Sequence, residues 1–142
     1  MELAEIYKLI DNSGISVGEV KLDNRVAFCT CTKEGYEGIG IDYSKIETTA
    51  DEKFVALEEY YHLYYGLTYK LDDTRNPLRR QNIERAERRA ERHAASKLVT
   101  LKMLTSAFAA GLRNLWELAE EFNVPEHAIT TAIEHYKCRG LL

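Results

Sequence analysis

Three side chains near the middle of the chain have the types and spacing of a metal site. Glu58, Glu59 and His62 lie in the run 54–66, which has no proline and no internal glycine and is predicted to be a helix. Residues four apart share one face of a helix, so Glu58 and His62 can point at a single ion. Imidazole nitrogen and carboxylate oxygen both bind zinc, and a nearby carboxylate can act as a general base. These residue types are the ones that metal-assisted hydrolysis uses, although two glutamates and a histidine on one helix are common.

Residues 58–62 read Glu-Glu-Tyr-Tyr-His and match the pattern HExxH at every position except the first. In HExxH metallopeptidases the two histidines hold zinc and the glutamate is the general base. Glu58 stands in place of the first histidine, Glu59 in place of the base and His62 in place of the second histidine. Because zinc accepts carboxylate oxygen, Glu58 can serve as a ligand. The same replacement can also mark a lost or weakened site, and spacing alone leaves both interpretations open.

A catalytic zinc site needs a third protein ligand, and the candidate is Glu87 in a long predicted helix. Glu87 shares a face of that helix with Ala90 and Ala94, whose small side chains allow another helix to approach closely. Glu84 and Glu91 share parts of the same face. The choice of Glu87 is therefore not unique by spacing alone.

Two other groups of potential ligands are interpreted as structural. Cys29-Thr30-Cys31 puts two thiols on one face of a strand, but this C-x-C pair has no partner pair elsewhere. His93 lies six residues after Glu87, about 120° around the helix from the side that would face the metal.

The elements around these residues indicate an α+β fold with a small antiparallel sheet and helices that follow it. Residues 38–43 form one expected strand, whose edge could pair with an extended substrate backbone. The other two strands are expected at Val17–Leu22 and Arg25–Thr30, joined by a turn at Asp23-Asn24. Helices are expected at 2–12, 50–66, 79–96, Thr100–Ala110, Leu115–Phe122 and Pro125–Tyr136. Residues 1–142 are read as a single domain, with a helical, helix-turn-helix-like tail over 101–142.

Composition favours a globular protein of the cytoplasm. The chain has 142 residues, is 45% hydrophobic and carries a net charge of -4. No apolar run approaches the roughly 18 residues that a membrane span needs. The acidic N-terminus is unlike a signal peptide, and three cysteines are too few for a disulfide framework.

Charge is distributed unevenly along the chain. Residues 1–66 are net -7, residues 67–102 are net +5 and residues 103–142 are net -2. The basic stretch could contact nucleic acid, which would motivate a DNA-binding regulator. We interpret it instead as a solvated helix that complements the acidic part, because glutamates interleave with its arginines. The acidic tail is likewise interpreted as packing or protein docking, and no specific DNA binding is expected.

Four segments, taken in order, resemble the ImmA/IrrE family of metallo-endopeptidases over roughly residues 15–136. They are Gly35–Asp42, Leu57–Tyr65, the run from Glu87-Arg88-Arg89-Ala90 through Ala94 to Lys97-Leu98-Val99, and Arg113–Glu120. The resemblance implies a zincin-like helical core, in which the HExxH helix supplies two zinc ligands and the base while a later helix supplies the third ligand. Family members from phages and mobile elements of Gram-positive bacteria are the most similar, and some of them also begin the motif with Glu-Glu.

Position by position, the resemblance implies that Glu58, His62 and Glu87 bind one divalent metal, with Glu59 as the catalytic base. The chain departs from the family at Tyr61, where a glycine is usual, and at His93, where an aromatic residue is usual. Zinc (Zn2+) is the implied cofactor, although two carboxylates and one imidazole shift the preference toward harder ions. The implied substrate is a protein, a transcriptional repressor of a phage or mobile element. The alternative is a catalytically silent module of the same fold that regulates a repressor by contact.

Overall fold

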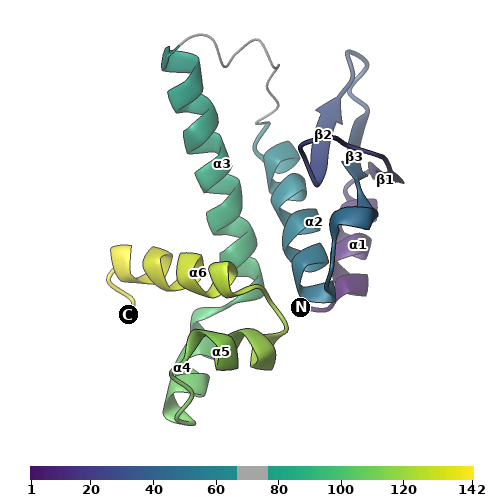
Figure 1. Ribbon diagram of the computed structural model, residues 1–142. Helices are drawn as coiled ribbons and strands as arrows, with labels where there is room; N and C mark the ends of the chain where they lie inside the picture. The colour runs from purple at the N-terminus through teal and green to yellow at the C-terminus, as the bar shows by residue number, and fades with distance from the viewer. Residues whose placement is uncertain (67–76) are drawn as a thin grey trace.

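The computed structural model describes residues 1–66 and 77–142, and that part of the chain has the predicted α+β composition (Figure 1). The first part of the basic stretch, residues 67–76, lies outside the described residues. The helices are α1 (Leu3–Asn12), α2 (Thr49–Tyr64), α3 (Pro77–Leu98), α4 (Leu101–Ala109), α5 (Leu115–Phe122) and α6 (Glu126–Cys138). The strands are β1 (Ile15–Glu19), β2 (Ala27–Cys31) and β3 (Glu37–Ile41), and a short 3-10 helix covers Tyr43–Lys45. Among the described helices, none combines the length and apolar character needed to cross a membrane.

The sheet is mixed rather than antiparallel. Its strand order is β1-β3-β2, with β1 parallel to β3 and β2 antiparallel to β3. The expected hairpin between the first two strands does not form, because β3 lies between them. Gly40 fits β3 to this crowded central place, because a Cβ there would lie 2.5 Å from the ring of Phe28. The prediction of a wholly antiparallel sheet was therefore wrong in topology, although all three strands exist.

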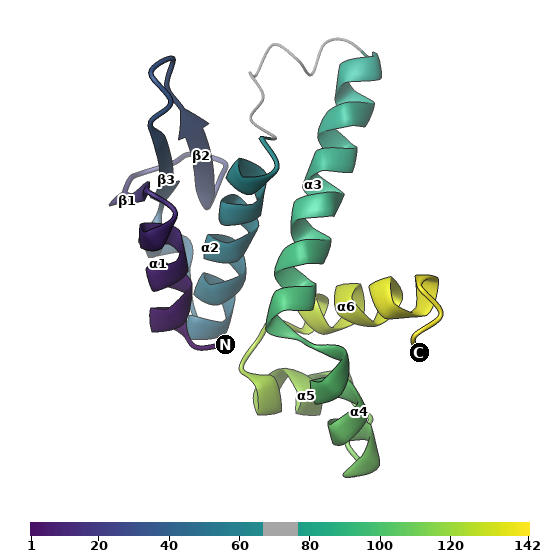
Figure 2. The ribbon, with the colours of Figure 1, turned by 180° about the vertical axis from the view of Figure 1, so that it is seen from behind.

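Helix α2 is the centre of the fold and lies between the sheet and α3 in both views (Figures 1 and 2). The helix begins where the Thr48 side chain accepts a hydrogen bond from the backbone N–H of Asp51. Its apolar residues are buried on several sides, including Phe54, Leu57 and Leu63. Such a helix holds its polar side chains in a fixed frame, because packing restrains the backbone that carries them.

Among the C-terminal helices, α6 packs against the lower part of α3 and α5 packs against α6 (Figure 1). Helix α6 crosses α3, where the hydroxyl of Tyr136 donates to the backbone carbonyls of Val99 at 2.8 Å and Ser96 at 3.4 Å. Helix α5 ends at Asn123, whose left-handed backbone (φ 50°) turns the chain toward α6. The Lys53 ammonium, on a side chain only 1% exposed, donates to the Asn123 carbonyl at 3.2 Å and so ties α2 to this turn.

Candidate metal centre

Glu58 and His62 of α2 and Glu87 of α3 converge at the α2–α3 interface. Each offers one ligand atom, and these atoms lie within 4.8 Å of one another. Nε2 of His62 is 3.1 Å from a carboxylate oxygen of Glu87, and the His62 side chain is almost fully buried. The four-residue spacing on α2 thus delivers its two side chains to one place, as the sequence predicted. The arrangement could hold a metal ion.

Packing of α3 decides which of its three glutamates joins this group. Ala90 and Ala94 are completely buried and Ala86 nearly so, which allows α3 to lie close against its neighbours. Glu84 is exposed and pairs with an arginine of its own helix. Glu91 accepts a hydrogen bond from the hydroxyl of Thr131 in α6 at 3.4 Å. Glu87 is the glutamate of α3 that reaches the ligand group of α2.

Glu59 lies beside the ligand group and faces strand β2. The thiol of Cys29 lies near the Glu59 carboxylate, close enough for each group to shift the pKa of the other. Burial raises the pKa of Cys29 to about 12, and the charges of Glu59 and Glu87 add to that effect. Sequence analysis missed this contact because it paired Cys29 with Cys31, which is exposed. Strand alternation puts both cysteines on one face, so the sequence carries no signal that singles out Cys29 or names its partner.

The carboxylates crowd one another in a partly buried setting. Burial raises the pKa of Glu58 to about 7, with further contributions from the charges of Glu59 and Glu87. Burial also raises the pKa of Glu59. Burial lowers the pKa of His62, but its hydrogen bond with Glu87 and the nearby carboxylates outweigh this and raise it. Three acidic groups around one imidazole make a site where a cation relieves repulsion.

The donor set fits a divalent metal. Imidazole nitrogen with two carboxylate oxygens is within the range of zinc ligands, and the carboxylates also suit harder ions such as manganese. The three side chains come from two packed helices, which limits how far they can move apart. His93 is not part of this group: its ring packs against Tyr61 and Tyr65 instead, with centroids 5.5 and 4.7 Å away.

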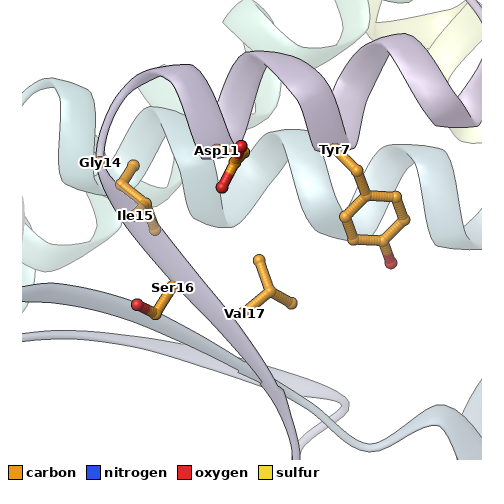
Figure 3. A pocket seen from close by; sticks show the side chains of 6 residues that line it. All are labelled: Tyr7, Asp11, Gly14, Ile15, Ser16 and Val17. Carbon is orange, nitrogen blue, oxygen red and sulfur yellow. The ribbon is translucent and has the colours of Figure 1, made fainter.

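A separate hollow lies between α1 and β1 and contains none of the metal-site residues (Figure 3). Its lining residues are Tyr7, Asp11, Gly14, Ile15, Ser16 and Val17. The hydroxyl of Tyr7 is already engaged, donating to Glu52 at 2.6 Å and lying 2.9 Å from the hydroxyl of Tyr43. These bonds join α1 to α2, so we interpret Tyr7 as a structural residue.

Comparison of the chain with protein-family models, with curated proteins and with solved structures found no match. The resemblance to the ImmA/IrrE family therefore rests on the sequence segments described above. The geometry of Glu58, His62 and Glu87 is an independent observation, because it comes from the packing of α2 against α3.

Proposed function

We propose that the chain is a zinc-dependent endopeptidase of the ImmA/IrrE type. The observation that carries this proposal is the convergence of Glu58, His62 and Glu87 within 4.8 Å, with Glu59 next to them on the same helix. A metal-ligand group with an adjacent, partly buried carboxylate is the minimum that metal-assisted peptide hydrolysis requires.

Glu58, His62 and Glu87 would hold the metal, which supplies Lewis-acid chemistry at a water molecule or a peptide carbonyl. Glu59 would take a proton from water onto its carboxylate and pass it to the leaving amine. The raised pKa of Glu59 suits both the uptake of the proton and its donation to the amine, because a base works best when its pKa lies near the working pH. The Cys29 thiol, which lies near the same carboxylate, would limit the orientations open to Glu59.

An extended substrate would pair with β2 rather than with the strand expected from the sequence. Both edges of β3 are already paired, with β1 and β2, so residues 38–43 cannot accept another strand. Within the described residues, β2 has one unpaired edge, and its Cys29 contacts Glu59. A peptide added to that edge would run past the proposed base.

The substrate class comes from the resemblance alone: a transcriptional repressor of a phage or mobile element. A catalytically silent module that binds such a repressor is the second proposal. The replacement of the first histidine by Glu58 favours it, because a carboxyl with a pKa of about 7 is partly protonated at neutral pH and competes poorly for metal.

Cleavage of a synthetic peptide mixture by the zinc-loaded chain, read by mass spectrometry, separates the two proposals. We expect new peptide ends with the wild-type chain and none with Glu59→Gln, which keeps the size of the side chain and all three ligands. His62→Ala should lose both metal and cleavage. If the metal-loaded wild-type chain cleaves no more than Glu59→Gln, the peptidase proposal fails and the binding module stands.

A further inference from the structure

Most charged residues of α3 fall into two separate arcs around the helix, with Arg80 inside the arc of the glutamates. With about 100° between successive residues, the three glutamates of α3 fall within an arc of about 60°. This arc includes Glu87 and so faces the metal centre. Four arginines fall within a neighbouring arc of about 100°, and all four are exposed; they are Arg85, Arg88, Arg89 and Arg92. The glutamates therefore do not interleave with these arginines in space, as they do in sequence.

The arginine stripe, defined by these four residues, is poorly neutralised. Arg88 pairs with Glu84 at 3.7 Å, but both side chains are about two-thirds exposed, and such pairs are weak. Within residues 1–66 and 77–142, no ion pair joins the other three arginines to a carboxylate. A row of exposed guanidinium groups with so few carboxylate partners is an anion-binding surface.

Arg139, just after the last residue of α6, adds one more positive charge near the stripe, next to the uncharged ring of His135. The two helices cross here, as the hydrogen bond from Thr131 to Glu91 and both ribbon views show (Figures 1 and 2). Burial lowers the pKa of His135, and the charges of Arg139 and Arg92 lower it further. The basic surface therefore runs over two helices that are far apart in the sequence.

Aromatic rings lie along one edge of the stripe, beside Arg89. The guanidinium carbon of Arg89 is 4.1 Å from the centre of the Tyr65 ring, and the Tyr65 hydroxyl is 3.3 Å from Nδ1 of His93. Tyr64 packs edge-on against Tyr65, with ring centres 5.0 Å apart, yet is 64% exposed. The exposed Tyr64 ring, next to the Tyr65 ring that Arg89 covers, offers a face on which a base can stack.

We propose that the arginine stripe and Tyr64 bind single-stranded nucleic acid without reading its sequence. The guanidinium groups span about 10 Å of helix, enough to meet several successive phosphates, and each can bond a phosphate with two N–H groups. Tyr64 would stack one base. The aromatic component favours a single strand over an acidic polypeptide, which offers carboxylates but no bases. This proposal does not depend on the metal centre, which faces the other side of α3.

Fluorescence anisotropy of a labelled 20-nucleotide oligothymidylate, titrated with the full chain, tests the proposal. We expect dissociation constants on the order of 10⁻⁶ to 10⁻⁵ M at low salt, with log K falling against log salt with a slope of about -3 for four phosphate contacts. Replacing Arg85, Arg89 and Arg92 together by alanine should weaken binding at least tenfold and reduce the slope by about 2. Tyr64→Ala should weaken binding severalfold and leave the slope unchanged.

The matched control removes three exposed basic groups elsewhere, in Lys8→Ala, Lys33→Ala and Arg113→Ala combined. It changes the net charge by the same amount and should leave oligonucleotide affinity within twofold. Circular dichroism should show both triple variants folded. Equal weakening by the two triple variants, no binding at low salt, or an unaffected Tyr64→Ala would each overturn the proposal. Polyglutamate that competes as well as oligothymidylate would assign the surface to acidic proteins, and tighter binding of a duplex of the same length would exclude single-strand recognition.

Discussion

Replacing Glu58 by glutamine should stabilise the metal-free protein and destroy its response to zinc. The substitution keeps the shape of the side chain and removes its charge. Burial and the neighbouring carboxylates raise the pKa of Glu58 from 4.5 to about 7. A carboxyl whose pKa is higher in the folded than in the unfolded chain stabilises the folded state only while it is protonated. The contribution of Glu58 to folding stability is therefore most favourable below about pH 4.5. It becomes steadily less favourable as the pH rises to about 7.

The size of the effect follows from that shift. Each pKa unit corresponds to about 1.4 kcal/mol, and allowing for partial solvent exposure leaves about 2 kcal/mol at pH 8. For a chain of this length we expect the melting temperature of chelator-treated Glu58→Gln to exceed that of the wild type by about 6 °C. The difference should vanish at pH 4, where Glu58 is protonated in both folded and unfolded chains.

With zinc bound, the wild type should become more stable than Glu58→Gln. At a free concentration one hundred times its dissociation constant, a ligand stabilises the folded state by about 2.7 kcal/mol. The wild type should gain this amount and Glu58→Gln almost none, measured by thermal melts with and without zinc at pH 8. If Glu58→Gln is the less stable protein without metal, the carboxylates do not repel one another as we argue. If it gains as much from zinc as the wild type does, Glu58 is not a ligand.

Three further variants test other contacts. Glu58→His should bind zinc more tightly in a competition titration with a chromogenic chelator, because zinc favours nitrogen over a single carboxylate here; weaker binding would mean that the site is tuned for carboxylate. Lys53→Ala should cost about 2–4 kcal/mol in urea unfolding, because it removes a buried bond to the α5 turn and leaves a cavity, and a loss under 1 kcal/mol would refute that role. Gly40→Ala should cost about 1–3 kcal/mol because its Cβ would meet the Phe28 ring at 2.5 Å, while Gly38→Ala, whose nearest contact is 3.6 Å, should cost clearly less.

Local patterns predicted the elements of this fold better than their arrangement. The apolar run around Glu58 and His62 gave the helix and the shared face, because both follow from backbone geometry within one turn. Period-two alternation revealed the strands but carries no information on their order or direction. The insertion of β3 between β1 and β2 depends on long-range packing, including the close approach of Phe28 to Gly40.

The same distinction holds within the candidate site. Spacing left Glu84, Glu87 and Glu91 as alternatives, and the resemblance chose Glu87. The physical reason lies in tertiary structure. Glu91 accepts a hydrogen bond from Thr131 of α6, and Glu84 is exposed to solvent. Cys29 could not be assigned to Glu59 from sequence, because the two residues meet only when β2 packs against α2.

A structure of the zinc-soaked crystal, with anomalous data collected on both sides of the zinc absorption edge, tests the central claim most directly. The account predicts one anomalous peak within about 2.0–2.2 Å of Nε2 of His62 and of one carboxylate oxygen each from Glu58 and Glu87. The peak should disappear in His62→Ala and persist in Glu59→Gln. A wild-type crystal with no peak at these three side chains, or with zinc bound only elsewhere, would contradict the metal centre and the peptidase function built on it.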